Sequence, residues 1–170
     1  MEKGKIIYLN GVSSSGKTSI VRAIQSRKDV FFYAVSFDMF EETIPAMYAD
    51  EEIYYSEAIT AMYYAAKKFS DFGQNVMIDG LIMNLTGLDE HYKKVQEIFL
   101  GYPLDIVEIY CPLEICKQRN IARGDRAENQ SERQSGIMEK SILYSYSVDT
   151  SIYSTDECVK IIINKSIKRI

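Results

Sequence analysis

Histidine, cysteine and proline are all scarce in this sequence, with one, three and three residues among 170. The cysteines, Cys111, Cys116 and Cys158, are odd in number, and their spacing matches neither a zinc knuckle nor a disulfide framework, so we expect them to be reduced and buried. The one histidine, His91, has no second metal ligand in reach, and we expect a surface or helix-capping role for it. No proline-, glycine- or serine-rich linker divides the chain, which predicts one domain over residues 1–170.

Long apolar runs and an excess of positive charge are also missing. No run approaches the ~18 apolar residues that cross a bilayer, and the first residues contain no signal-peptide core, so we expect a cytoplasmic protein without a membrane partner. Lysine and arginine number 20 against 24 acidic residues, a net charge of −4, so no global basic field attracts nucleic acid. Hydrophobic residues at 46% and charged residues at 26% match ordinary globular chains and exclude disorder, collagen and coiled coil.

Five short runs rich in apolar and β-branched residues predict strands. They do not alternate cleanly between apolar and polar residues, which is typical of strands covered on both faces in a parallel sheet. A strand followed by a helix, repeated along one chain, predicts an α/β three-layer sandwich with right-handed crossovers. The predicted strands are residues 5–10, 31–37, 75–79, 105–111 and 144–148.

Several stretches between these strands show the apolar stripe of an amphipathic helix. The last of them begins with a capping-box signature, Ser154-x-x-Glu157, although residues 161–163 could alternatively form a strand. A longer helix is predicted within residues 50–74. The stripe that it is expected to bury consists of Ala58, Met62, Ala65, Phe69 and Phe72.

Residues 11–18 read GVSSSGKT, which matches the pattern G-x-x-x-x-G-K-[ST] between a strand and an amphipathic helix. Its two glycines allow close backbone approach, so successive amide N–H groups can point into one anion-sized hollow at the positive end of the helix. The motif predicts a phosphate-binding loop (P-loop) in which Lys17 bridges the β- and γ-phosphates of ATP and the Thr18 hydroxyl holds Mg²⁺. The nucleotide-binding residues predicted are Gly11, Ser13, Ser14, Ser15, Gly16, Lys17, Thr18 and Ser19, joined by Arg119.

Two motifs of a switch GTPase are missing. Its D-x-x-G motif needs a glycine three residues after the aspartate, but after Asp79 the glycine follows directly. The stretch of residues 164–167 reads NKSI and lacks the carboxylate of a guanine-reading N-K-x-D motif. The sequence therefore favours a kinase or an ATPase over a switch protein.

Three arginines gather near one predicted loop. Arg119 and Arg123 are four residues apart, hence on one face of a helix, and Arg126 follows across Gly124. Planar guanidinium groups match the oxygens over which negative charge spreads during phosphoryl transfer. We therefore expect a lid over about residues 119–135 that brings Arg123 and Arg126 to the transferred group. A solvated helix face with local acidic partners is the alternative.

Two aspartates lie where predicted strands end, at the carboxyl edge at which open α/β folds bind ligands. Asp38 directly follows the second strand and Asp79 ends the third. One could accept the proton of a reacting hydroxyl and the other could support Mg²⁺ through water, and the spacing does not decide between them. Either could instead cap the next helix.

A tyrosine-rich stretch follows Asp38 and could line an aromatic pocket for a small molecule together with Met39, Phe40 and Met47. Half of these tyrosines are better explained as half-buried helix residues. The tyrosines are Tyr48, Tyr54, Tyr55, Tyr63 and Tyr64.

Four segments together resemble chloramphenicol phosphotransferase and its relatives among the P-loop kinases. They are LNGVSSSGKTSIVRAIQ (residues 9–25), DMFEETIP (38–45), ARGDR (122–126) and VDT (148–150), in the family's order along nearly the whole chain. The resemblance implies a five-stranded parallel sheet, ATP and Mg²⁺, and transfer of the γ-phosphoryl group to a hydroxyl of a small molecule, for example an antibiotic.

By position in these motifs, the resemblance implies that Asp38 is the general base, Lys17 the P-loop lysine, and Arg123 and Arg126 the lid arginines. The segment between Asp38 and Asp79, which is expected to help form the acceptor pocket, is shorter than the resemblance implies. Other acceptors therefore stay open, such as a metabolite, a nucleotide, or the sugar nucleotide of a toxin-type kinase. A module that binds a nucleotide without transferring phosphate is the alternative outside the enzymes, and Asp38 would be dispensable in it.

Overall fold

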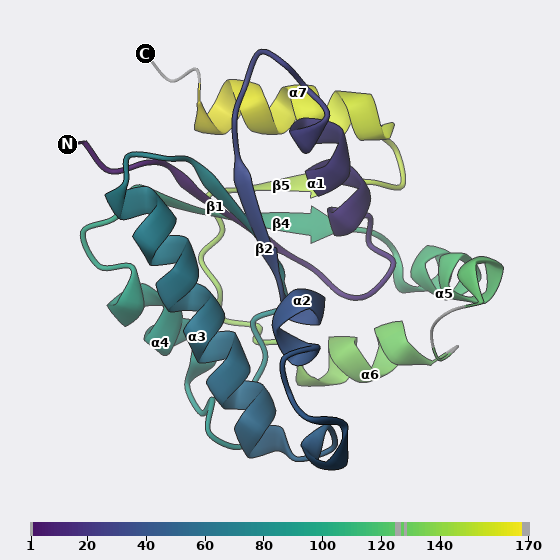
Figure 1. Ribbon diagram of the computed structural model, residues 1–170. Coiled ribbons are helices and arrows are strands. Elements are labelled where there is room, and N and C mark those ends of the chain that lie inside the picture. Colours follow the sequence, from purple (N-terminus) through teal and green to yellow (C-terminus); the bar gives the residue numbers. More distant parts are fainter. Residues whose placement is uncertain (1, 125–126, 128, 168–170) are drawn as a thin grey trace.

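The computed structural model describes residues 2–124, 127 and 129–167, so Arg126 of the predicted lid lies outside the described residues. Five parallel strands form one sheet in the order β2-β3-β1-β4-β5 (Figure 1). This confirms the predicted α/β fold with a five-stranded parallel sheet. The strands are β1 (Ile6–Asn10), β2 (Tyr33–Ser36), β3 (Val76–Gly80), β4 (Leu104–Tyr110) and β5 (Tyr146–Asp149).

Seven helices and one short 3-10 turn connect these strands within the described part of the chain. In Figure 1, α1 and α7 cover one face of the sheet, α3 and α4 cover the other, and α5 and α6 lie beyond the carboxyl ends of the strands. The helices are α1 (Lys17–Gln25), α2 (Phe37–Glu41), α3 (Glu52–Asp71), α4 (His91–Ile98), α5 (Leu113–Arg123), α6 (Gln130–Ile137) and α7 (Thr155–Ser166), and the turn is Ala46–Tyr48.

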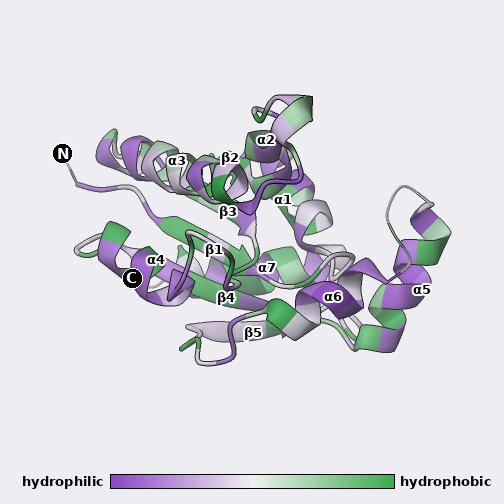
Figure 2. Cartoon of the chain, turned by 90° about the horizontal axis from the view of Figure 1, so that it is seen from below, coloured by the Kyte–Doolittle hydropathy of each residue, from purple (hydrophilic) through white to green (hydrophobic). Residues whose placement is uncertain are grey.

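Strand β1 is the centre of the sheet and has no exposed surface along its five residues. Its alternate side chains enter two separate cores. Ile7 and Leu9 pack with residues of α1 and α7, whereas Ile6 and Tyr8 pack with residues of α3 and α4. Figure 2 shows β1 and β4 largely in green, the hydrophobic colour, whereas the helices around them alternate between green and purple, the hydrophilic colour. The uninterrupted apolar run that predicted this strand therefore reflects burial on both faces.

Helix α3 forms where it was predicted, but it buries a different face. Of the five side chains in the predicted stripe only Met62 is buried, and Phe72 is 53% exposed. Two serines lie on the true inner face, where Ser56 Oγ donates to Thr86 O and Ser70 Oγ donates to Gly4 O. A search for apolar residues alone misses a face that contains hydrogen-bonded serines. The buried residues of α3 are Ser56, Ile59, Met62, Tyr63, Ala66 and Ser70.

The last helix agrees with its sequence signal. Ser154 and Glu157 form the capping box at the start of α7, and the alternative strand at residues 161–163 is wrong because these residues lie inside the helix. Cys111, Cys116 and Cys158 are free and buried, as predicted. Among the described residues, no helix is long and apolar enough to cross a membrane.

Candidate active site

The loop between β1 and α1 has the backbone geometry that phosphate binding needs. A side chain at Gly11 would come within 2.6 Å of the carbonyl oxygen of Ile109, so only glycine allows this approach to β4. Gly16 has φ 105°, a left-handed conformation that residues with side chains rarely adopt. Helix α1 begins directly afterwards at Lys17 and directs its N-terminal N–H groups toward the loop.

Lys17 and Thr18 connect this loop with the end of β3. Thr18 Oγ1 donates to Asp79 Oδ2 at 2.7 Å, and Lys17 Nζ lies 3.9 Å from Asp79 Oδ1. Lys17 Nζ also donates to the carbonyl oxygens of Gly11 at 2.6 Å and Val12 at 3.0 Å. Asp79 therefore belongs to the side of the site that holds the phosphate loop.

Arg119 is hydrogen-bonded to the P-loop and to the residue that follows β5. Its guanidinium group donates to Ser14 O at 3.3 Å and to Thr150 Oγ1 and O at 3.1 and 2.8 Å. Thr150 Oγ1 in turn donates to Ser15 O at 2.6 Å. Thr150, the threonine of the VDT segment, thus connects the end of β5 with the P-loop. The guanidinium group of Arg119 is held by a carbonyl oxygen of the same loop.

A second set of contacts, absent from the sequence analysis, holds α5 and α6 against the P-loop. Asn120 is fully buried; its Oδ1 accepts from Ser14 Oγ at 2.5 Å and its Nδ2 donates to Ser131 Oγ at the start of α6. Gln134 Oε1, also on α6, accepts from the backbone N–H of Ser13. The predicted lid is therefore in direct contact with the phosphate loop through neutral polar side chains as well as arginine.

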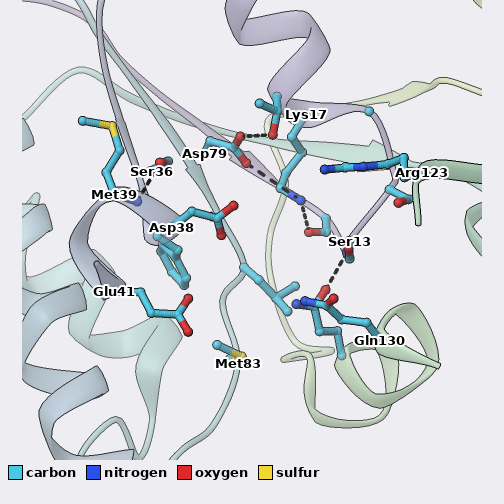
Figure 3. Close-up of a pocket in the computed structure, with 18 of the residues that line it drawn as sticks. Ser13, Lys17, Ser36, Asp38, Met39, Glu41, Asp79, Met83, Arg123 and Gln130 are labelled. Atoms are coloured by element: carbon cyan, nitrogen blue, oxygen red, sulfur yellow. Dashed lines mark hydrogen bonds and ion pairs between the residues drawn. The ribbon is translucent and has the colours of Figure 1, made fainter. Parts of the chain in front are cut away.

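On the other side of the site, α2 carries Asp38 in its first turn. Ser36 caps this helix by accepting from Met39 N at 3.2 Å, and so ends β2 and turns the chain over the carboxyl edge of the sheet. A cavity of about 1110 Å³ lies between α2 and the P-loop and is lined by Asp38, Lys17 and Arg123, among others. Figure 3 shows Asp38 on one side of this cavity, with Lys17 and Arg123 opposite.

Most of the predicted nucleotide-binding residues share this cavity. Ser15 does not: it is 1% exposed, it is not part of the lining, and its Oγ has no hydrogen-bond partner among the described residues. The predicted residues that do line the cavity are Gly11, Ser13, Ser14, Gly16, Lys17, Thr18, Ser19, Asp38, Arg119 and Arg123.

The prediction that the tyrosine-rich stretch lines a pocket is confirmed only in part. Tyr55 lines the cavity, as does Met39, but Tyr63 is buried in the core beneath it. Tyr48 and Tyr54 pack against each other with ring centroids 5.1 Å apart, outside the cavity. Tyr64 lines a separate hollow of about 400 Å³, which α3 forms together with Gly87 and Lys94 of α4. A helix distributes neighbouring tyrosines over several faces, which the clustering in sequence hides.

His91 is not at the surface, contrary to the sequence expectation. It is fully buried at the start of α4, where Nε2 lies 2.6 Å from Tyr63 Oη and Nδ1 lies 2.8 Å from Met83 O. Tyr63 Oη in turn lies 3.0 Å from Tyr8 Oη on β1. Met83 lines the cavity, so this buried chain of polar groups holds one wall of the site. Burial lowers the pKa of His91 to about 4.

This pKa predicts a specific loss of stability in mild acid. Below pH ~6.5 the unfolded chain gains a proton at His91 that the folded chain does not take up until about pH 4. The free energy of unfolding therefore falls by about 1.4 kcal/mol per pH unit, roughly 3 kcal/mol over this window, and the loss is absent above it.

The check is urea unfolding from pH 7.5 to pH 4.5 for the wild type and for His91→Gln, whose amide does not titrate. We expect the difference between the two unfolding free energies to shrink or reverse as the pH falls. Parallel curves for the two proteins would show that His91 accepts its proton freely in the folded state.

The fold and the site define the class of protein. A five-stranded parallel sheet with a P-loop, an arginine-bearing helix pair and an aspartate across one cavity is the architecture of the P-loop kinases. The family model of the chloramphenicol phosphotransferase-like proteins matches residues 4–167. The chain belongs to this family, as the sequence motifs predicted.

Similar proteins agree with this assignment. A Mycobacterium tuberculosis protein provisionally named an O-phosphotransferase is 24% identical over 186 aligned positions, which span 94% of this chain and 81% of that protein. The M. tuberculosis APS kinase in complex with AMPPNP and APS has a TM-score of 0.70 at 18% identity, over 97% of this chain and 98% of the other. A gluconokinase from Sinorhizobium meliloti has a TM-score of 0.65 at 17% identity, over 98% and 93%. At such identities these structures show a shared fold.

Proposed function

We propose that this protein is an ATP-dependent kinase that transfers the γ-phosphoryl group to a hydroxyl of a small molecule. The observation that carries the proposal is the arrangement of one cavity, with the P-loop and Lys17 on one side and Asp38 on the other. An acceptor hydroxyl between them would have a proton acceptor and a phosphoryl donor within one space.

The donor side suits a nucleoside triphosphate with a divalent cation. P-loop residues and the first residues of α1 line the cavity, and Lys17 adds a positive charge to the N-terminal end of that helix. The Thr18 hydroxyl and the Asp79 carboxylate supply oxygen atoms of the kind that Mg²⁺ prefers, and these two residues would hold the cation beside the phosphates. Among the described residues no group of three or more His, Cys, Asp or Glu side chains could hold a metal alone. When bound, Mg²⁺ would neutralise phosphate charge during transfer.

On the side of the cavity where the acceptor would bind, Asp38 is the proposed proton acceptor. Asp79 accepts a hydrogen bond from Thr18 and lies near Lys17, which places it with the phosphates. Asp38 lies in the first turn of α2 on the opposite wall, where it can accept the proton of the attacking hydroxyl. We therefore propose Asp38 as the base and Asp79 as the group that supports the cation, one of the two assignments that the sequence left open.

The family name directs the first search for an acceptor toward hydroxyl-bearing antibiotics, including chloramphenicol. The test is incubation of the protein with ATP and Mg²⁺ and each member of a panel of antibiotics, nucleosides and sugars. We expect at least one compound to gain the mass of one phosphoryl group. ATP binding without modification of any compound would contradict a kinase and favour a nucleotide-binding module.

Arg123 offers a sharper test of the lid. It is exposed on the last turn of α5 and lines the cavity near the P-loop. If its guanidinium stabilises charge that is greatest during transfer, Arg123→Ala should lower kcat by ~10² while ATP affinity changes only a few-fold. Arg123→Lys should restore little activity, because an ammonium lacks the bidentate fork.

Steady-state kinetics and ATP titration measure both effects. Arg27→Ala is a matched control, because Arg27 pairs with Asp29 at an exposed position outside the cavity. Unchanged kcat in Arg123→Ala would assign Arg123 to an ordinary solvated helix face.

A further inference from the structure

The charges that line the cavity are divided between its two halves. The half formed by the P-loop, α1, α5 and α6 carries the basic side chains Lys17, Arg22, Arg119, Arg123 and Arg133. The half formed by residues 36–55 contributes no lysine, arginine or histidine to the lining. Its acidic residues are Asp38, Glu41, Glu42, Asp50, Glu51 and Glu52.

The acidic half belongs to a long stretch of chain without positive charge. Residues 29–66 contain eight acidic residues and no lysine, arginine or histidine. Because the whole chain has a net charge of −4, the remaining residues carry a net charge of +4. The acidic residues that are clustered in this stretch of sequence therefore line one half of the cavity, and the basic residues line the other half.

Several of these acidic side chains form no ion pair with a lysine or arginine of the described residues. No lysine or arginine nitrogen of the described residues lies within 4.0 Å of the carboxylates of Glu42, Asp50 or Glu51. Glu52 Oε2 accepts a hydrogen bond from Thr86 N at 3.1 Å, and hydrogen bonding with the side chain of Thr86, and then with its backbone, lowers the pKa of Glu52, so its carboxylate stays ionised at neutral pH. An acceptor that enters this half meets several acidic side chains that have no basic partner within 4.0 Å among the described residues.

The cavity also has an apolar part of its lining, which we call the apolar floor, formed by this half together with two residues that follow β3. Phe37, Tyr55, Leu81 and Met83 line it, and Met83 is held in place by the buried His91. Figure 3 shows Glu41 and Asp38 on one wall with Met83 at the lower end of the pocket. Such a surface suits the carbon body of a small molecule, while the carboxylates suit a group of opposite charge.

We propose that the acceptor is a hydroxyl compound that carries a protonated amine. Its ammonium group lies toward Glu42, Asp50 and Glu51, its carbon body lies on the apolar floor, and its hydroxyl lies at Asp38. This inference rests on the proposed kinase function of the same cavity. An anionic acceptor, such as a nucleotide or a sugar acid, is repelled by the same carboxylates, and a neutral acceptor gains nothing from them.

The test compares molecules that differ in charge but share hydroxyl groups. The first pair is the amino-diol core of chloramphenicol and its N-acetyl derivative, and the second set is glucosamine, N-acetylglucosamine and gluconate. Affinity for the Mg²⁺-ATP-bound protein is measured by calorimetry, and phosphoryl transfer by mass. We expect the amine of each set to bind about tenfold or more tightly than its neutral or anionic counterpart, as for several partly exposed charge pairs, with the preference weakening as salt is added.

A variant with Glu42→Gln, Asp50→Asn and Glu51→Gln should lose this preference, because it removes the charges and keeps the side-chain shapes. Its matched control, Glu57→Gln with Asp89→Asn and Glu97→Gln, changes net charge equally at exposed sites outside the cavity and should keep the preference.

The outcomes separate this inference from the proposed function. Equal or tighter binding of the neutral or anionic compounds, or no binding of either amine, overturns the cationic acceptor. If phosphoryl transfer to a neutral or anionic compound of the wider panel is then observed, the proposed kinase function is retained and only the cationic acceptor is rejected. Failure to bind ATP or to modify any compound would instead contradict the proposed function itself.

Discussion

Replacement of Lys17 by alanine is expected to lower phosphoryl transfer by ~10² or more while the fold is retained. Lys17 Nζ donates to the carbonyl oxygens of Gly11 and Val12 and lies 3.9 Å from Asp79 Oδ1, at the start of α1. Its charge is therefore placed for the phosphates, and loss of a preorganised charge typically costs this much in rate. Lys17 is not part of either hydrophobic core.

Activity assays and thermal unfolding together check this expectation. Lys28→Ala serves as the control, because Lys28 is an exposed lysine shortly after the same helix and outside the cavity. Near-normal turnover of Lys17→Ala would show that the loop does not bind the reacting phosphates. A large loss of stability would show that Lys17 has a structural role instead.

Asp38→Asn is expected to lower transfer by ~10² to 10⁴, the usual contribution of a general base, with ATP affinity within a few-fold of wild type. Asparagine keeps the size of the side chain and can still form hydrogen bonds, but it cannot accept the proton. The position of Asp38 across the cavity from the P-loop predicts that nucleotide binding is little affected.

The companion variant Asp79→Asn separates the two aspartates. Because Asp79 accepts from Thr18 Oγ1, its replacement should raise the Mg²⁺ concentration needed for half-maximal activity more than it changes the rate at saturating Mg²⁺. A metal titration of both variants measures the difference. Abolished transfer in Asp79→Asn beside a nearly silent Asp38→Asn would reverse the two roles.

Much of the fold could be read from local sequence because the strands are buried on both faces. Runs such as residues 5–10 are short and end at turn residues, which favours strands, and all five predicted strands overlap observed ones. The second strand ends earlier than predicted, since Ser36 caps α2 and Phe37 begins that helix. A five-residue helix gives too short a pattern for periodicity to detect.

The candidate site was predictable where function depends on contiguous motifs. Residues 11–18 follow from sequence spacing, and the position of Asp38 close after β2 follows from sheet topology, although Asp38 lies in the first turn of α2 and not at the end of the strand. The contacts of Asn120 and Gln134 with the P-loop depend on how α5 and α6 fold back, and no local pattern records that. The same holds for His91, whose partners Tyr63 and Met83 come from other segments.

The most direct test of the kinase assignment is the fate of ATP labelled in its γ-phosphoryl group. The protein is incubated with Mg²⁺, labelled ATP and the panel of hydroxyl compounds, and the label is traced to product, inorganic phosphate or unreacted ATP. We predict label on a hydroxyl oxygen of one acceptor, dependent on Lys17 and Asp38. Label found only in inorganic phosphate or unreacted ATP for every acceptor would contradict phosphoryl transfer.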